Sequence, residues 1–321
     1  MPISAKTLAV TLALGLSPLV QAQTWPDKPL RVVVGFPPGG AADQIARLVS
    51  VPLAEALKQP VVVENRPGAN GNIAGETVAK APADGYTLLM GSGGMVSVNP
   101  HIYATMPFDP VKDLTPVASA ARVLVYLMAR PTLEVKDASD FIAYVKARPG
   151  KLSYGSAGNG SSPHLAGEMM KSQAGLFAVH VPYRGAAPAL NDLMAGQIDF
   201  YFDPGIGLQA AKAGRTKLLA VGSLKRSPLF PEVPTLDEVG LKGFDADSVF
   251  GFYAPAHTPP AVVARLNTEI NRILGTPTAR ERITNLGGEA LPLTPAAFGA
   301  KSLDDSRRFG AIIKERSIKG D

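Results

Sequence analysis

The chain has 321 residues, of which 46% are hydrophobic and 18% charged, and it contains no cysteine. This composition is typical of a globular protein and excludes a disordered chain, and without cysteine the fold is held by packing rather than by disulfides. The formal net charge is +5, but the basic residues are scattered, so no nucleic-acid interface is expected.

The first 22 residues follow the pattern of an export signal. Lys6 precedes an apolar stretch over 8–20, and small or modest residues at 20–22 suit a signal peptidase. The stretch is shorter than the roughly 20 residues that a membrane-spanning helix needs. An N-terminal core helix is the alternative, but a polar segment follows at once. We therefore expect residues 1–22 to be a signal peptide cleaved near Ala22.

Apolar runs typical of strands alternate with helical patterns along the rest of the chain, which predicts an α/β architecture with mainly parallel sheets. The expected strands lie at 31–36, 61–63, 86–90, 123–128, 152–154, 178–183, 198–202, 218–221 and 249–254. The expected helices begin near residues 43, 73, 141, 161, 187 and 260, and Pro52 should kink or split the first of them.

The length of the exported chain fits two lobes of roughly 150 residues each. The strand at 123–128 should pass from the first lobe to the second, and the strand at 249–254 should return. These crossings predict lobe 1 at 23–121 plus 246–321 and lobe 2 at 122–245. Two connections restrict the lobes to a hinge movement, which can close them on a ligand.

One design occurs twice: a strand enters a small glycine-rich loop, and a helix follows at once. The first loop spans 37–42 after Phe36, and the second spans 155–160. The first backbone N–H groups of a helix have no intrahelical partner, and together with the positive end of the helix dipole they bind anions. Two such units predict a ligand with acidic groups that is gripped from two sides.

Asp43 and Ser162 are the expected N-caps of the two helices, with Pro163 in the first helical position after Ser162. We expect Asp43 to orient its loop rather than to bind an acidic group, because two carboxylates repel each other. The alternatives to ligand binding are an ordinary tight turn in the first unit and simple helix capping in the second.

The chain resembles the Bug/TctC family over essentially all of its mature length. The resemblance lies in the segments 37–43 (PPGGAAD), 62–69 (VVENRPGA), 154–165, 180–190, 231–235 and 252–255, which follow the family's order. Members of this family are extracytoplasmic solute receptors of tripartite tricarboxylate transporters.

The resemblance implies a two-lobed α/β fold like that of periplasmic binding proteins, of the Venus flytrap type II, with a double-strand hinge. It implies a periplasmic receptor for a small carboxylate, such as a dicarboxylate, an acidic amino acid or an aromatic acid, with membrane permease subunits as partners. Backbone amides of 38–43 and 156–162 would hold the carboxylate, partly through water. We expect a monomer without a cofactor.

The candidate ligand-binding residues come from both loops and from nearby strand ends: Phe36, Pro38, Gly39, Gly40, Ala41, Ala42, Asp43, Ser92, Ser156, Gly158, Asn159, Gly160, Ser161, Ser162, His164, Arg184 and Asp203. Arg184 suits a second carboxylate or, alternatively, an ion pair. Asp203 should face the cleft, although Pro204 follows where the family often has Asn. Met95 and Val96 depart from the family pattern and predict a less polar wall or core packing.

No catalytic group and no metal site is expected. A serine hydrolase would use Ser161 or Ser162 with His164, but these lie on one short segment without an evident third partner. The other histidines are isolated and cysteine is absent, which disfavours a metal. The glycine spacing lacks the dinucleotide fingerprint. The alternatives to a transport receptor are a ligand-sensing subunit for a membrane kinase and an exported serine hydrolase.

Overall fold

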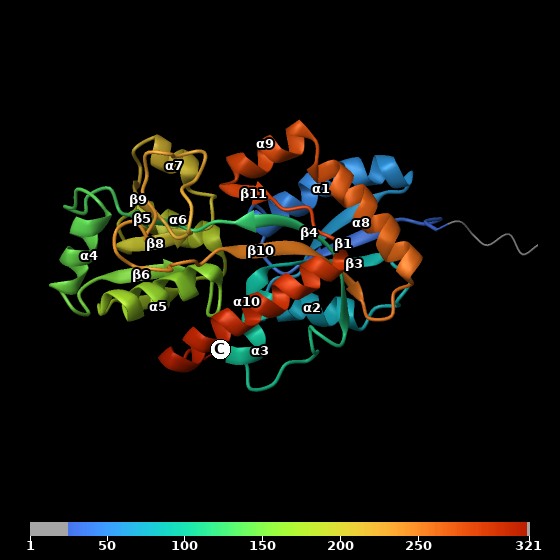
Figure 1. The fold of residues 1–321 in the computed structure, drawn as a ribbon, viewed down its shortest axis with the longest axis horizontal. Coiled ribbons are helices and arrows are strands. Elements are labelled where there is room, and N and C mark those ends of the chain that lie inside the picture. Colours follow the sequence, from blue (N-terminus) through green and yellow to red (C-terminus); the bar gives the residue numbers. More distant parts are fainter. Residues whose placement is uncertain (1–24, 320–321) are drawn as a thin grey trace, which may run out of the picture.

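The structure, a computed structural model, describes residues 25–319, and the predicted signal peptide lies outside them (Figure 1). The first of two sheets has the strand order β11-β4-β10-β3-β1-β2. In it, β1 is parallel to β2 and β3, whereas β10 is antiparallel to β3 and β4, and β11 is antiparallel to β4. The strands are β1 (Leu30–Val34), β2 (Val61–Asn65), β3 (Thr87–Gly91), β4 (Leu114–Val123), β10 (Ser248–Pro255) and β11 (Gly288–Ala290).

The second sheet has the order β7-β6-β8-β5-β9. Here β6 is parallel to β7 and β8, whereas β5 is antiparallel to β8 and β9. The strands are β5 (Tyr126–Ala129), β6 (Ser153–Ser156), β7 (Val179–Pro182), β8 (Phe200–Asp203) and β9 (Lys217–Val221). The predicted two-lobed α/β class is confirmed, but both sheets are mixed: parallel pairing is limited to three neighbouring strands in each.

Helices cover both faces of the first sheet. Successive side chains of β1 point to opposite faces, and apolar side chains on both faces are buried by helices. Val32 and Val34 pack with α1 (Ala41–Leu57) and α8 (Pro260–Leu274), beside α9 (Pro277–Asn285). Val33 points to the other face, where α2 (Asn72–Ala79) and α10 (Pro295–Arg316) contribute to a separate buried cluster. The short helix α3 (Asn99–Ile102) lies beside α10.

The second sheet is also covered on both faces. Residues of α4 (Ala138–Lys146) and α5 (Ser162–Ala174) form one buried cluster with the sheet, and residues of α6 (Ala186–Met194) and α7 (Leu208–Lys212) form another. The part of the chain built on the first sheet is called lobe 1 below, and the part built on the second is called lobe 2. The residue boundaries predicted for the lobes stay a prediction.

The chain crosses between the sheets at β4–β5 and again just before β10, and β4 and β10 lie side by side there (Figure 1). The strand predicted at 123–128 is in fact two strands, because β4 ends at Val123 in the first sheet and β5 starts at Tyr126 in the second. Backbone hydrogen bonds from Gly222 to Val125 and from Ala246 to Gly222 join the two crossings.

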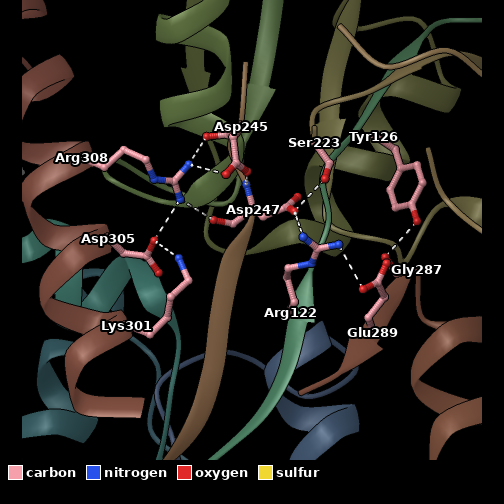
Figure 2. A network of polar contacts seen from close by, with 10 residues as sticks. All are labelled: Arg122, Tyr126, Ser223, Asp245, Asp247, Gly287, Glu289, Lys301, Asp305 and Arg308. Atoms are coloured by element: carbon pink, nitrogen blue, oxygen red, sulfur yellow. Dashed lines mark hydrogen bonds and ion pairs between the residues drawn. The ribbon is translucent and has the colours of Figure 1, made fainter. Parts of the chain in front are cut away.

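Two C-terminal segments of lobe 1 also reach lobe 2. Phe309 and Ile313 of α10 share a buried cluster with Leu165 of α5. The turn before β11 contacts lobe 2 through the hydroxyl of Tyr126, which donates to the carbonyl of Gly287 at 2.8 Å (Figure 2). No element was predicted where α7, α9, β11 and α10 lie. Of the two outcomes expected at Pro52, a kink or a split, the split does not occur, since α1 runs through Pro52 as one helix. Among the described residues, none of the helices is long and apolar enough to cross a membrane.

Candidate functional site

The two predicted loops meet at one cavity between the lobes, with a volume of about 70 Å³, which we call the inner cavity. Among the described residues, none with a charged side chain lines it. Lobe 1 contributes Phe36, Pro37, Pro38, Gly40, Ala41, Ala42, Asn70, Ser92, Gly94 and Phe250, and lobe 2 contributes Ala157, Ser161, Ser162, Pro163, Gly185, Ala186, Ala187, Pro188 and Pro204. Eight predicted residues are therefore in the lining: Phe36, Pro38, Gly40, Ala41, Ala42, Ser92, Ser161 and Ser162.

The start of α1 supplies the first set of donors. Gly40 is the N-cap and is extended (φ −73°, ψ 167°), and the first intrahelical bond runs from Gln44 N–H to the Gly40 carbonyl. The N–H groups of Ala41 and Ala42 therefore have no intrahelical acceptor, and both residues line the inner cavity. The prediction that Asp43 is the N-cap was wrong, because the N-cap is Gly40, three residues earlier.

Asp43 nevertheless orients the loop, as predicted. Its carboxylate accepts hydrogen bonds from Gly39 N–H at 2.9 Å, Arg47 Nε at 3.0 Å and Asn65 Nδ2 at 2.9 Å. Burial disfavours the ionised form, but these hydrogen bonds outweigh it and hold the pKa of Asp43 below its usual value. Asp43 and Gly39 are thus tied to each other and do not line the inner cavity.

The start of α5 supplies the second set of donors. Its N-cap is Ser161 rather than the predicted Ser162, and Pro163 follows in the second helical position. The Ser161 hydroxyl donates to the carbonyl of Gly158 at 2.7 Å and does not cap the helix. Leu165 N–H makes the first intrahelical bond, to the Ser161 carbonyl, so the N–H of Ser162 has no intrahelical acceptor.

A third helix start reaches the same cavity: this helix was predicted to begin near residue 187, but its place at the site was not predicted. Gly185 is the N-cap of α6, with φ +119°, a conformation that favours glycine. A Cβ on Gly185 would lie 3.3 Å from Pro37 of the other lobe, so the two lobes meet closely here. The signal was present in the sequence, where an apolar strand, Gly185 and a helical pattern follow one another. Three helix N-termini therefore converge on the inner cavity, from both lobes.

Two stacked histidines hold the second loop in place. Gly160 N–H donates to His164 Nδ1 at 3.0 Å, and the imidazole of His164 stacks on His180 with 3.9 Å between ring centres. His180 Nε2 lies 2.7 Å from Ser156 Oγ, and Gly158 N–H donates to that oxygen at 3.2 Å. Ser156, Gly160 and His164 therefore shape the loop and do not line the inner cavity.

The same geometry bears on protonation and catalysis. Burial, followed by the charges of His164 and Lys171, lowers the pKa of His180 to about 3, so His180 stays neutral near pH 7. His164 Nδ1 is occupied as an acceptor, and the Ser161 hydroxyl is committed to a backbone carbonyl. Both groups thus bond to the backbone of their own loop, which does not favour a serine–histidine hydrolase that uses Ser161. Within residues 25–319, no three His, Cys, Asp or Glu side chains gather as a metal would require.

A second, larger cavity of about 520 Å³ adjoins the first, and we call it the outer cavity. The two share Phe36, Pro37, Asn70, Ala157 and Gly185 in their linings. The predicted residues Gly158, Asn159 and Arg184 line the outer cavity and not the inner one.

Asp203 does not face the cleft, contrary to the prediction. It is fully buried, and its Oδ1 accepts hydrogen bonds from Gly205 N–H at 2.7 Å and Gly207 N–H at 2.8 Å. Burial raises the pKa of Asp203 to about 7. The residue braces the turn that carries Pro204 into the wall of the inner cavity. Met95 and Val96 are buried in a lobe 1 cluster, which agrees with the core-packing alternative.

This fold and site define a two-lobed solute-binding receptor. The family described as "Tripartite tricarboxylate transporter family receptor" (TctC) matches residues 45–318, and the chain belongs to that family. It is not an enzyme family. The chain is 39% identical over 293 residues to a protein encoded in the tcbD-tcbE intergenic region of Pseudomonas sp. strain P51, which covers 91% of this chain and 87% of the relative.

Two solved structures with ligands have the same fold. One is Rpa4515 of R. palustris with adipate, at 36% identity and a TM-score of 0.89, covering 92% of this chain and 99% of the other. Another is MatC (Rpa3494) of Rhodopseudomonas palustris with bound malate, at 32% identity and a TM-score of 0.84, covering 90% of this chain and 99% of the other.

Proposed function

We propose that this protein is a periplasmic receptor that captures a small organic carboxylate between its lobes and delivers it to the membrane permease subunits of a tripartite tricarboxylate transporter. The observation that carries the proposal is the convergence of three helix N-termini on one interlobe cavity. Backbone N–H groups without intrahelical acceptors, at the positive ends of three helix dipoles, match the charge and geometry of a carboxylate.

The lining of the inner cavity supports the same ligand class. Its apolar surfaces, which include Phe36, Pro163 and Phe250, suit a carbon skeleton. Micromolar affinity requires about −8 kcal/mol, which several charge-assisted hydrogen bonds in an enclosed site supply. The adipate and malate bound in the two solved relatives point in the same direction.

Calorimetry of the ligand-free mature chain against adipate, malate, glutamate and benzoate tests the binding. We expect at least one of these acids to bind in the micromolar range. Gly40→Val should weaken that binding at least 30-fold, because a Cβ at Gly40 fits the backbone, with Pro37 O at 3.6 Å as its nearest neighbour, but narrows the cavity. Gly275→Val, at the end of α8 and with a similar φ, is the matched control. A protein that is folded and ligand-free but binds no acid would refute the proposal.

The cellular location of the protein, its oligomeric state and the delivery of ligand to a permease each have a separate test. Intact-mass measurement of protein recovered from the periplasm should show a chain starting near Gln23, and light scattering should show a monomer. Crosslinking in membranes from the native host should capture permease subunits, and more of them with ligand than without. Capture of a membrane kinase instead would replace delivery by signalling.

A further inference from the structure

The inner and outer cavities differ in charge. Among the described residues, the lining of the inner cavity includes no charged residue, whereas the lining of the outer cavity includes one, Arg184. The two cavities share wall residues and so lie next to each other, with the helix N-termini in the lining of the inner cavity and Arg184 in the lining of the outer one.

Arg184 is available to a ligand. Its side chain is exposed, and it forms no ion pair or hydrogen bond with any other described residue. The neighbouring hydroxyl of Tyr183 is already committed, since it donates to Asp192 at 2.7 Å. Arg66, next to a residue of the outer lining, is paired with Glu64 at 2.6 Å. Of the two described arginines in or next to this lining, Arg66 and Arg184, Arg184 is therefore the one without a partner to meet an incoming charge.

From this arrangement we infer that the ligand is an elongated diacid: one carboxylate lies at the helix N-termini of the inner cavity, and the second reaches Arg184 in the outer cavity. The inference rests on the proposed carboxylate-binding function and assigns Arg184 as a residue that determines specificity. A planar guanidinium binds a carboxylate through two parallel N–H···O bonds, which a flexible ammonium cannot reproduce.

The same arrangement disfavours short diacids. If both carboxylates of a short diacid lie within the inner cavity, the second carboxylate has no cation beside it. It also loses its hydrating water where the walls are apolar, which is unfavourable. A monoacid of equal length avoids that cost but gains nothing from Arg184. Selectivity should therefore depend on chain length and on the presence of the distal charge.

Calorimetry with malonate, succinate, glutarate, adipate and pimelate, and with hexanoate as the uncharged-end counterpart of adipate, tests the inference. We expect affinity to rise at least tenfold from succinate to adipate, and adipate to bind at least tenfold more tightly than hexanoate. Arg184→Gln should abolish the difference in affinity between adipate and hexanoate, while the affinity for hexanoate stays within about twofold of the wild-type value. Arg184→Lys should retain part of the difference between adipate and hexanoate.

Arg215→Gln is the matched control, because Arg215 is also exposed on lobe 2 and lies in neither lining. Equal weakening of adipate and hexanoate by Arg184→Gln would assign Arg184 a purely structural role and overturn the inference. So would an unchanged preference, or tighter binding of succinate than of adipate. If the wild-type chain binds none of these acids, the proposed function itself fails.

Discussion

Arg122 Nη1 lies 3.4 Å from Asp247 Oδ2 at the crossing between the lobes, where β4 ends and β10 begins (Figure 2). Arg122 also binds Glu289 of β11 at 3.0 Å, and Asp247 accepts from Ser223 at 2.8 Å. Arg308 of α10 adds hydrogen bonds to the backbone of the same returning segment. The connection between the lobes is therefore cross-linked by polar groups, of which Asp247 and Ser223 are buried.

Removing the cation from this pair should destabilise the protein. Burial and the nearby Asp245 raise the pKa of Asp247 to about 7, against the opposing effect of Arg122. In Arg122→Met the carboxylate of Asp247 loses its main counter-charge, and we expect the free energy of unfolding to fall by about 2 kcal/mol at pH 8. Urea denaturation measures this.

The loss in Arg122→Met should be smaller at pH 5.5, where Asp247 can take up a proton. Arg265→Met is the control: the exposed Arg265 pairs with Glu269, which keeps a second partner in Arg272, so its loss should cost about 0.5 kcal/mol at most. Equal costs for Arg122→Met at both pH values would show that the packing of the arginine stem, and not the charge of Asp247, is what matters.

A second, independent prediction concerns the contribution of Asp203 to the pH dependence of stability. Its pKa is about 7 in the folded protein but about 3.9 in an unfolded chain. Between these values the folded state binds more protons than the unfolded state, so the contribution of Asp203 to stability is lost as the pH rises from about 4 through 7.

Asp203→Asn keeps an oxygen acceptor for Gly205 and Gly207 and removes the titration. Relative to wild type, its free energy of unfolding should increase by about 2–3 kcal/mol between pH 5 and 8. Asp304→Asn, at an exposed carboxyl, should show no such change. Parallel pH profiles for Asp203→Asn and wild type would contradict the raised pKa.

The two glycine-rich loops were predictable from sequence because their signal is local: an apolar strand, small residues and then helical spacing. The errors within them are also local. Asp and Ser are both favoured N-caps, so propensity selected Asp43 and Ser162, whereas Gly40 and Ser161 take those positions. A carboxylate in the first helical turn looks the same in sequence whether it caps the helix or, like Asp43, reaches back to the loop.

What could not be predicted depends on how distant segments meet. Asp203 follows a strand, where a polar residue often faces a ligand, but Gly205 and Gly207 fold their N–H groups onto it. The start of α6 belongs to the site because Gly185, its N-cap, lies close to Pro37 of the other lobe. No pattern within residues 180–190 reveals that contact.

The interlobe role of α10 is a third property to test. Ile313 is buried in the cluster that joins α10 to Leu165 of lobe 2. Ile313→Ala should lower the free energy of unfolding by about 3 kcal/mol, through lost apolar burial and the cavity left behind. Leu303→Ala, on the same helix but 46% exposed, should cost much less. Equal effects in urea denaturation would mean that the contact between α10 and α5 contributes little.

His164 allows the donor geometry of the second loop to be tested without a change in the lining of the inner cavity. Phenylalanine in place of His164 keeps a ring to stack on His180 but removes the acceptor for Gly160 N–H. Releasing that N–H costs about 1–2 kcal/mol and frees the loop that leads into Ser161 and Ser162.

We therefore expect His164→Phe to weaken carboxylate binding about tenfold in calorimetry, which corresponds to about 1.4 kcal/mol, while the protein stays folded. His101→Phe is the control, because His101 is exposed on lobe 1, bonds to Ser306 and lines neither cavity. Unchanged affinity in a stably folded His164→Phe variant would show that Gly160 needs no side-chain acceptor to present the helix start to the ligand.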